Sequence, residues 1–314
     1  MSEFKEYEED VIKRIKDNKG ELVPQEYLSP TAILAYLKCP RCYFYQYIAK
    51  FRPEPSIHLV KGNIVHGTLE DFFKKYDEED LRKKMFDLME HHWVKNRKQI
   101  EELELTEEEL AMHRKDIENI TEEYYITLMR KIKMLLDAEK VENERHAFYM
   151  LKPKFRELYV KSERLKVRGY IDRVDEDFNG IITLGDYKTS KKYGIGLPLD
   201  YQRQLAIYAL LYKEQEGKVA DFVSIIFLRY GEELLLQVTP SLIKHARDLV
   251  TDVYSKTRST DINDYPVGMG SQIRWCNYGD LHDGTAQFEE LYRREQLKYR
   301  LQNKEVKKDE DKTD

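Results

Sequence analysis

Two short stretches, Gly-Tyr-Ile-Asp-Arg-Val at residues 169–174 and Leu-Gly-Asp-Tyr-Lys-Thr-Ser at residues 184–190, carry the strongest structural signal in this chain. The first apolar, strand-like run leads to Asp172 and the second to Asp186. Asp-Phe-Asn-Gly at residues 177–180 supplies turn residues between the runs, so the two should pair as a hairpin. The two carboxylates then converge at one end of a sheet.

Lys188 follows Asp186 by two residues, and residues two apart in a strand point to the same face. Paired carboxylates suit a hard divalent cation such as Mg²⁺. A neighbouring ammonium group can orient the attacking water or stabilise charge that develops on a phosphate. This combination fits phosphodiester hydrolysis, although aspartate and lysine also occur as ordinary charges at strand ends.

The remaining pattern predicts an α/β fold with a mixed central sheet flanked by helices. Strand-like runs occupy residues 157–160, 167–174, 180–188, 222–229 and 233–238, and helical patterns occupy residues 199–217 and 239–256. Ser29-Pro30 predicts a helix start with serine as N-cap, and we expect a second helix to begin near Gly62. Residues 78–140 contain no glycine or proline and carry apolar residues at helical spacing, which predicts two or three long helices. We expect a charged lead-in (1–28), a helical region (29–152), the catalytic core (153–290) and a charged tail (291–314).

Composition excludes some classes of protein. The chain has 314 residues, is 41% hydrophobic and 35% charged, and has a net charge of −5 with a pI of about 6.0. Such a chain is not a basic protein that coats nucleic acid, but an enzyme with a local basic groove is compatible with it. No apolar run is long enough to span a bilayer, and the charged N-terminus lacks the pattern of a signal peptide. We therefore expect a cytoplasmic protein without a membrane partner.

The two aspartate stretches resemble the core of the RecB-like PD-(D/E)XK nucleases, such as the CRISPR-associated exonucleases and AddB-type domains. Three other motifs match in the expected order. Gly-Asn-Ile-Val-His at residues 62–66 resembles the upstream histidine motif, Gln-Leu-Ala-Ile-Tyr at residues 204–208 the downstream helix, and residues 29–41 the opening helix. The resemblance covers roughly residues 29–280. It implies a restriction-endonuclease-like core and cleavage of DNA with Mg²⁺ or Mn²⁺.

The resemblance also implies roles for single residues. Lys188 positions or activates the attacking water, and the metal is held by His66, Asp172, Asp186 and the backbone carbonyl of Tyr187. It leaves two interpretations for Gln204 and Tyr208, which either contact DNA or brace the site. Glu157 occupies a first-strand position that is often acidic in the family, where it either supports the site or simply ends the packed strand.

Basic residues concentrate near the aspartates. Eight lysines and arginines lie between residues 152 and 173, and Lys191 and Lys192 follow the second aspartate stretch. We expect Arg173, Lys191 and Lys192 to contact or support DNA, because a positive groove suits a phosphate backbone. The alternative is that many of these residues decorate exposed strand faces. The aromatic cluster at residues 43–47 similarly fits either a packed core or base stacking.

The cysteines depart from the family pattern. Many relatives hold an iron–sulfur cluster on one N-terminal and three C-terminal cysteines. This chain has Cys39, Cys42 and Cys276 only, with Gly279 where a further ligand would stand. We therefore expect no iron–sulfur cluster, and interpret Cys39 and Cys276 as remnants of a cluster site. A zinc site that also uses Cys42 and His282 is the alternative.

The predicted function is that of a metal-dependent deoxyribonuclease, an exonuclease acting on single strands or DNA ends. Recombination, repair, replication and CRISPR adaptation all fit, and the sequence does not choose among them or fix an oligomeric state. Phosphate-binding motifs of the G-x-G-x-x-G and G-x-x-x-x-G-K-[ST] types are absent, so a helicase or recombination partner would be a separate chain. The alternatives are a catalytically silent DNA-binding or scaffold subunit and a metal-free interaction protein that works through its long helices.

Overall fold

The computed structural model describes residues 22–50, 56–77, 80–191 and 196–268. The chain divides into two compact units. One consists of residues 1–54 and 251–314, and the other of residues 55–250. The second unit contains every residue from His66 to Tyr208 that we expected at the site.

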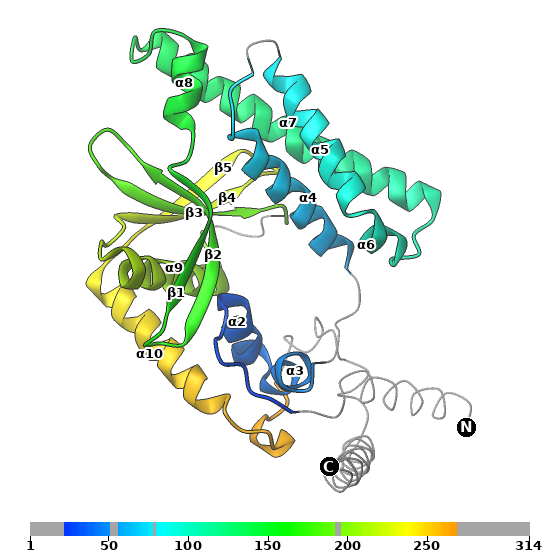
Figure 1. The fold of residues 1–314 in the computed structure, drawn as a ribbon, viewed down its shortest axis with the longest axis vertical. Coiled ribbons are helices and arrows are strands. Elements are labelled where there is room, and N and C mark those ends of the chain that lie inside the picture. Colours follow the sequence, from blue (N-terminus) through cyan, green and yellow to red (C-terminus); the bar gives the residue numbers. More distant parts are fainter. Residues whose placement is uncertain (1–21, 51–55, 78–79, 192–195, 269–314) are drawn as a thin grey trace, which may run out of the picture. The chain divides into compact units, whose positions relative to one another are not determined.

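The second unit is built on a five-stranded mixed sheet (Figure 1). The strands stand in chain order, antiparallel except for the parallel pair β3–β4. They are β1 (Phe155–Ser162), β2 (Val167–Glu176), β3 (Ile182–Lys188), β4 (Phe222–Phe227) and β5 (Glu232–Gln237). The predicted mixed α/β sheet is therefore confirmed.

The turn between β2 and β3 forms as its sequence predicts. The Asp177 carboxylate accepts hydrogen bonds from the backbone N–H groups of Asn179 (2.8 Å) and Ile181 (2.9 Å). Gly180 adopts a φ of +75°, a left-handed conformation that glycine takes without steric cost. This turn sets the register in which Arg173 pairs with Gly185 and Val174 with Leu184.

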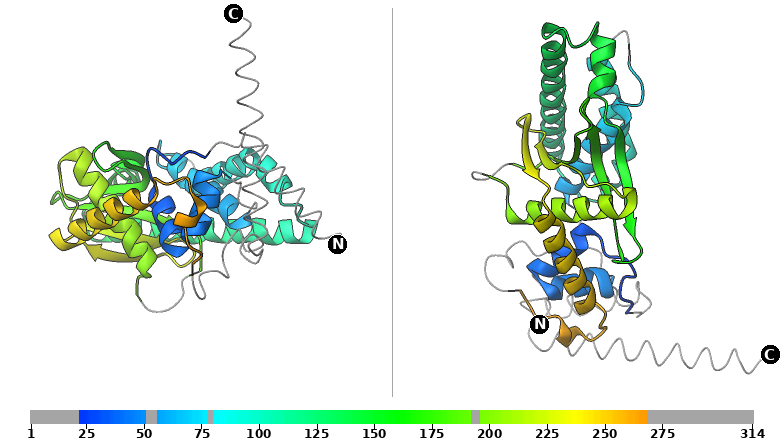
Figure 2. Two further views of the ribbon diagram at one scale, coloured as in Figure 1. Left: turned by 90° about the horizontal axis from the view of Figure 1, so that it is seen from below. Right: turned by 90° about the vertical axis from the view of Figure 1, so that its left-hand side faces the viewer.

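Helices cover both faces of the sheet. Helix α9 (Leu199–Glu216) makes the crossover from β3 to β4, lies across the strands (Figure 2), and ends at Gly217 with a φ of +68°. Helix α10 (Pro240–Lys256) follows β5. The other face carries a helical layer of α4 (Ile57–Phe72), α5 (Leu81–Lys95), α6 (Arg97–Glu101), α7 (Glu107–Asp137) and α8 (Glu144–Leu151).

The long helix α7 follows from its apolar spacing and its cap. Its buried stripe, at i, i+3 and i+4 spacing, includes Ile117, Ile120, Tyr124, Leu128 and Ile132. Thr106 and Glu109 form a reciprocal capping box that satisfies N–H groups at its start. The prediction of long helices between residues 78 and 140 is thus confirmed.

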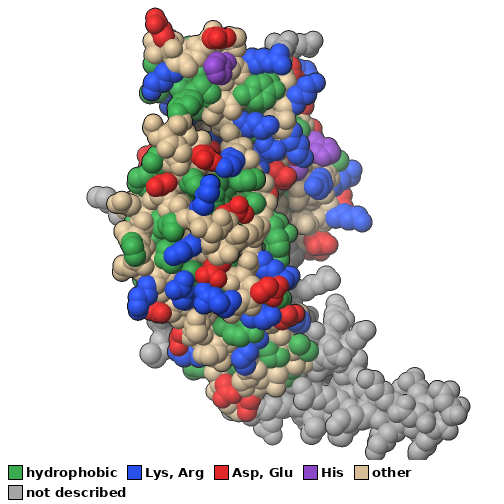
Figure 3. Space-filling view, turned by 60° about the vertical axis from the view of Figure 1, so that its left-hand side comes forward, with side chains coloured by type: hydrophobic (Ala, Val, Ile, Leu, Met, Phe, Trp, Pro, Cys, Tyr) green, Lys and Arg blue, Asp and Glu red, His purple; other side chains and the backbone are tan. Residues whose placement is uncertain are grey.

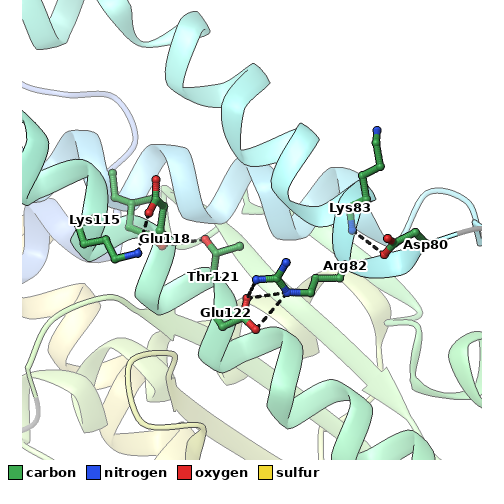
Figure 4. Close-up of polar contacts among 8 residues, drawn as sticks. Asp80, Arg82, Lys83, Lys115, Glu118, Thr121 and Glu122 are labelled. Atoms are coloured by element: carbon green, nitrogen blue, oxygen red, sulfur yellow. Dashed lines mark hydrogen bonds and ion pairs between the residues drawn. The ribbon is translucent and has the colours of Figure 1, made fainter.

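Polar residues on the outer side of the layer link α5 to α7 (Figure 4). Arg82 on α5 donates to both carboxylate oxygens of Glu122 on α7, at 2.8 Å for the shortest contact. The Asp80 side chain caps α5 by accepting from the N–H of Lys83 at 2.8 Å. Exposed pairs such as these each add little stability, so the apolar stripe holds the layer together.

Helix α4 begins earlier than predicted. Its first residue is Ile57, whereas we expected a start near Gly62. Val60 and Ile64 are both buried and lie one turn apart, so the apolar face of the helix extends through Gly62. The cost of a glycine in a helix interior is about 1 kcal/mol, which this burial outweighs.

In the first unit, helix α2 (Pro30–Lys38) begins as predicted, with the Ser29 hydroxyl accepting from the N–H of Ala32 at 3.1 Å. Helix α3 (Pro40–Tyr43) and a π-helical turn (Phe44–Ile48) follow. Tyr43, Phe44 and Tyr45 are fully buried, and the Tyr43 ring stacks on that of Tyr265. These aromatic residues form a packed core, so the base-stacking interpretation is wrong for them.

No helix in the described ranges combines the length and apolar composition needed to cross a membrane.

An ion cluster around Asp116 joins three parts of the second unit. The Asp116 carboxylate on α7 contacts Lys61 Nζ of α4 at 2.6 Å and Arg229 Nη2, just after β4, at 2.9 Å. Arg229 also donates to the backbone carbonyl of Thr189, the residue after Lys188, at 3.4 Å. Hydrogen bonding to Arg229, followed by that to Lys61, holds the pKa of Asp116 well below its usual range.

We predict that Asp116→Asn lowers the free energy of unfolding by about 2 kcal/mol, because it leaves two partly buried cations without their counter-charge. Urea denaturation at neutral pH measures the loss. Asp137→Asn on the same helix removes an exposed pair with Lys133 and should cost less than about 0.5 kcal/mol. Equal losses in the two variants would show that the Asp116 cluster is no more than a surface pair.

Candidate functional site

The site lies where strands β2 and β3 separate. Their pairing runs from Glu176–Ile182 to Arg173–Gly185 and stops there. Beyond that point, β2 continues beside β1 and β3 continues beside β4. At the fork, the Asp172 carboxylate accepts a hydrogen bond from the backbone N–H of Tyr187 at 2.7 Å. This side-chain hydrogen bond takes the place of the next backbone pair between β2 and β3, and it holds Asp172 beside β3.

Asp186 and Lys188 share one side of this fork. Lys188 Nζ lies 2.6 Å from Asp186 Oδ2. The Gln204 side chain on α9 joins both residues, since its Nε2 donates to Asp186 Oδ1 (3.0 Å) and its Oε1 accepts from Lys188 Nζ (3.0 Å). Gln204 Nε2 also donates to the Tyr208 hydroxyl, one helical turn on, at 3.1 Å. Gln204 and Tyr208 therefore lie where residues that brace the site would lie.

His66, Glu157 and Asp172 meet on the other side of the fork. One potential ligand atom from each lies within 4.8 Å of those of the other two. His66 Nδ1 is 3.5 Å from Asp172 Oδ2. The three residues come from α4, β1 and β2, so the helical layer and the sheet both contribute to one cluster.

Glu157 reaches this cluster through an unusual backbone conformation. Its φ is +48°, in the left-handed region that costs a non-glycine residue roughly 1–2 kcal/mol. By the register of its neighbours, Glu157 stands opposite Asp172, but the pairing of β1 with β2 is interrupted between Arg156 and Leu158. Strained backbone of this kind persists where surrounding structure holds it, and it is often found at functional sites.

Burial and mutual repulsion raise the pKa values of two carboxyl groups. Burial, and then the charge of Asp172, raises the pKa of Glu157 to about 7. Burial raises the pKa of Asp186 to about 6, against the opposing charge of Lys188. Burial alone would lower the pKa of His66, but its hydrogen bond to Asp172 and the nearby carboxylates raise it overall. The pKa of Lys188 is likewise raised, because the Asp186 charge outweighs burial.

These residues fit a divalent cation. Two carboxylates and an imidazole within 4.8 Å of one another offer the donors that such an ion takes from proteins. Asp186 Oδ2 is buried, and its neighbour is the Lys188 ammonium at 2.6 Å. The predicted carbonyl ligand belongs to Tyr187, at the same fork.

Two predicted residues have side chains that face the helical layer. Arg173 donates to Asp175 (2.5 Å), the Tyr124 hydroxyl (3.4 Å) and the Leu151 carbonyl (3.2 Å), and its side chain is only 13% exposed. Its guanidinium therefore stabilises the fold and is not free to meet DNA. The Tyr187 ring is buried against His66 and Tyr124, so this side chain is part of the packing.

The eight lysines and arginines between residues 152 and 173, here called the basic band, largely have acidic neighbours. On the face in Figure 3, lysine and arginine side chains are interspersed with acidic and apolar ones. At least five of the eight basic residues contact acidic side chains within the described part of the chain, in the pairs Lys154–Glu176, Lys161–Glu163, Arg164–Glu214, Lys166–Glu163 and Arg173–Asp175. Charge along the band is thus mixed, and a role in DNA binding would fall to particular residues.

Lys191 is exposed just beyond β3, as a DNA contact would require. Lys192, Cys276 and His282 lie outside the described residues. Cys39 is buried in the first unit, where its Sγ accepts from the N–H groups of Cys42 (3.2 Å) and Gly268 (3.4 Å). The predicted absence of an iron–sulfur cluster and the zinc alternative stay predictions.

Sequence reasoning missed Tyr201. The Lys188 ammonium lies 5.1 Å from the centre of its ring, and the Tyr201 hydroxyl is 3.3 Å from that of Ser190. Tyr201 is three residues before Gln204 on α9, so helical spacing alone places it beside a residue that was predicted. The Asp116 cluster was missed as well, because its members are far apart in the sequence.

The chain is similar to known nucleases. The family model described as the PD-(D/E)XK nuclease superfamily matches residues 27–281. A solved structure of a candidate exonuclease from Eubacterium rectale is 15% identical, with a TM-score of 0.44 over 81% of this chain and 85% of that one. The structure of a protein named SSO0001 is 13% identical, with a TM-score of 0.30 over 71% of this chain and 95% of that one. No curated protein sequence matches the chain.

We predict that the metal-free protein loses stability as pH rises through the titration of Glu157. Its pKa is about 7 in the folded protein, against 4.5 for an ordinary glutamate. The folded state thus binds this proton more tightly, so the contribution is complete below pH 4.5 and is lost as pH rises through about 7.

Urea denaturation in EDTA between pH about 5 and about 8 should show a loss on the order of 1–2 kcal/mol from this group. Glu157→Gln, which cannot ionise, should show a correspondingly smaller loss, and Glu101→Gln on the exposed α6 should match wild type. Identical pH dependence in wild type and Glu157→Gln would rule out a proton held by Glu157.

Proposed function

Since this chain belongs to the PD-(D/E)XK nuclease superfamily, we propose that it is a RecB-like deoxyribonuclease that uses Mg²⁺ or Mn²⁺. We further propose that it acts as an exonuclease on single strands or DNA ends. The observation that carries the proposal is the pairing, at one fork of the sheet, of the His66–Glu157–Asp172 cluster with Asp186 and Lys188.

His66, Glu157, Asp172 and Asp186, with the Tyr187 carbonyl, would hold the ion. When bound, a divalent ion supplies Lewis-acid stabilisation of the phosphate and a bound water of lowered pKa. The carboxylates suit Mg²⁺ and Mn²⁺ alike, whereas the imidazole of His66 is a donor that Mg²⁺ uses less readily. This mixed donor set is why both ions belong in the assay.

Lys188 would act as a cation. Its pKa is raised by Asp186, so at neutral pH it keeps its proton and is poorly suited to be a general base. Its ammonium, held by Asp186 and Gln204, can donate to the attacking water and to a non-bridging phosphate oxygen. Such a donor stabilises the charge that develops as the phosphodiester bond breaks.

Gln204 would fix the geometry of the two catalytic side chains. One amide group holds Asp186 through its nitrogen and Lys188 through its oxygen. Tyr208 supports Gln204 in turn, and the pKa of the Tyr208 hydroxyl is raised well above its ordinary value by burial and by Asp186, so the group stays neutral. This network favours the bracing interpretation over direct contact with DNA.

The proposed activity predicts metal-dependent cleavage of end-labelled single-stranded or blunt duplex DNA, with none in EDTA. Lys188→Ala should lower kcat by about 10²–10³-fold, because it removes one charged donor to the transition state. Asp186→Asn should reduce cleavage at least as strongly. The ladder of products over time distinguishes stepwise removal from an end from internal cutting.

Lys133→Ala serves as the control, since this exposed α7 residue forms a surface ion pair with Asp137. It should cut like wild type. Cleavage that survives both site substitutions would contradict the assignment of Asp186 and Lys188. A folded wild type that cuts neither substrate with Mg²⁺ or Mn²⁺ would contradict the proposed activity and favour the silent scaffold alternative.

A second kinetic prediction separates bracing from DNA contact at Gln204. Gln204→Ala should lower kcat by about 10- to 100-fold while KM stays within about twofold, because a bracing side chain does not touch the substrate. Gln99→Ala, at an exposed position of α6, is the matched control and should leave both constants unchanged. A rise in KM with unchanged kcat would instead assign Gln204 to the DNA.

A further inference from the structure

The β1–β2 hairpin presents two exposed tyrosines side by side. Tyr159 pairs directly with Tyr170 across the two strands, and their ring centres are 5.1 Å apart. The two side chains are 40% and 54% exposed. Directly opposed residues of an antiparallel pair project from the same face, so these rings form one aromatic surface.

This aromatic surface is continuous with the metal-binding cluster. Asp172 follows Tyr170 by two residues, and Glu157 precedes Tyr159 by two. Residues two apart in a strand share a face and are separated by roughly 7 Å. The burial of Val167 and Ile171 shows that the alternation is regular up to Asp172. The tyrosine pair therefore lies one step along the hairpin from the carboxylates.

A basic pair occupies the next step. Lys161 pairs with Arg168 across the strands, two residues beyond the tyrosines. Arg168 is exposed, and Lys161 contacts Glu163 at 2.6 Å in an ion pair whose carboxylate is 66% exposed. An ion pair of this kind is weak and can give way to a phosphate. The hairpin face thus runs from carboxylates to aromatic rings to basic groups.

This order of groups fits a single-stranded nucleic acid. Unpaired bases stack on exposed aromatic side chains whatever their sequence, and basic groups bind the phosphates between them. Bases within a duplex are already stacked on their neighbours and offer no free face to a tyrosine. Glu157 and Asp172 would hold the ion that acts on the phosphate, so the DNA strand would approach that ion along the hairpin.

We propose that the exposed face of the β1–β2 hairpin, formed by Tyr159, Tyr170, Lys161 and Arg168, is a track that guides single-stranded DNA to the metal-binding cluster. The proposal rests on the proposed nuclease function and narrows its substrate to a single strand. It assigns base stacking to the tyrosines and phosphate binding to the basic pair.

The test is fluorescence anisotropy of a labelled oligothymidylate and of a blunt duplex in EDTA, so that binding is measured without cleavage. The double substitution Tyr159→Ala and Tyr170→Ala should raise Kd for the single strand about tenfold or more. The matching Tyr→Phe pair keeps the rings and should bind like wild type. Duplex affinity should change by less than about twofold, since no duplex base stacks on these rings.

Phe178→Ala is the matched control, because Phe178 is 76% exposed in the β2–β3 turn, at the opposite end of β3 from Asp186. It should bind both DNAs like wild type. The cross-strand ring contact also stabilises the hairpin, so thermal unfolding is recorded for every variant. Unchanged single-strand affinity in the double alanine variant, or equal weakening for both DNAs, would overturn the track.

The basic pair has an independent readout. The double substitution Lys161→Gln and Arg168→Gln should make the slope of log K against log salt concentration less negative by roughly 1.4 for the single strand. This is about 0.7 for each phosphate that is no longer neutralised. An unchanged slope would overturn this part of the track. The binding assay contains no divalent ion, so its result does not depend on cleavage. A protein that binds the single strand through the tyrosines, but cuts no DNA when Mg²⁺ or Mn²⁺ is added, would contradict the proposed function and leave the track supported.

Discussion

The hydrogen bond from the Tyr187 N–H to the Asp172 carboxylate is the contact on which the site depends. It stands where the next rung of the β2–β3 ladder would form, so it ends the pairing and keeps the strands apart. Because of this fork, Asp172 and Asp186 lie on adjacent strands without being locked side by side in a ladder. Both Lys188 and the Tyr187 carbonyl follow within two residues.

The fork brings together acidic groups whose burial and mutual repulsion cost free energy in the folded protein. Asp186 is only 3% exposed, and the pKa values of Asp186 and Glu157 are raised to about 6 and about 7. The left-handed backbone of Glu157 adds strain. A cation that neutralises these groups would relieve their repulsion, so metal binding and stability should be coupled. Buried charge, repulsion and backbone strain that occur together at one place are typical of a functional site.

The helical layer is more than a cover for the sheet. It supplies His66 from α4, and the Asp116 cluster ties α4 to the segment that follows Lys188, through Arg229 and the Thr189 carbonyl. The two sides of the fork are thereby fixed relative to each other through α7. This arrangement accounts for the partly buried ion cluster of Lys61, Asp116 and Arg229.

Much of the fold could be predicted because its signals are local. The turn at Asp177–Gly180, the cap at Ser29 and the helix end at Gly217 depend on a few adjacent residues, and the structure has all three. The placement of Asp172 and Asp186 on adjacent strands followed from the strand patterns and that turn.

What the sequence could not indicate depends on tertiary contacts. The helix pattern gave no sign that Ile57 already belongs to α4, and the charge of Arg173 gave no sign that its side chain turns into the helical layer. Nor does any local pattern predict the left-handed backbone of Glu157 within a strand, because residues other than glycine rarely adopt this conformation. Lys61, Asp116 and Arg229 likewise meet only in the folded chain.

The central claim is that residues of α4, β1, β2 and β3 form one divalent-ion site at the fork. The most direct measurement is a crystal structure of the protein with Mn²⁺, in which anomalous scattering locates the ion. We predict a peak within about 2.5 Å of ligand atoms from His66, Glu157 and Asp172, on the side facing Asp186. An ordered fork with no Mn²⁺ near Asp172, in crystals that bind Mn²⁺ elsewhere, would contradict the account.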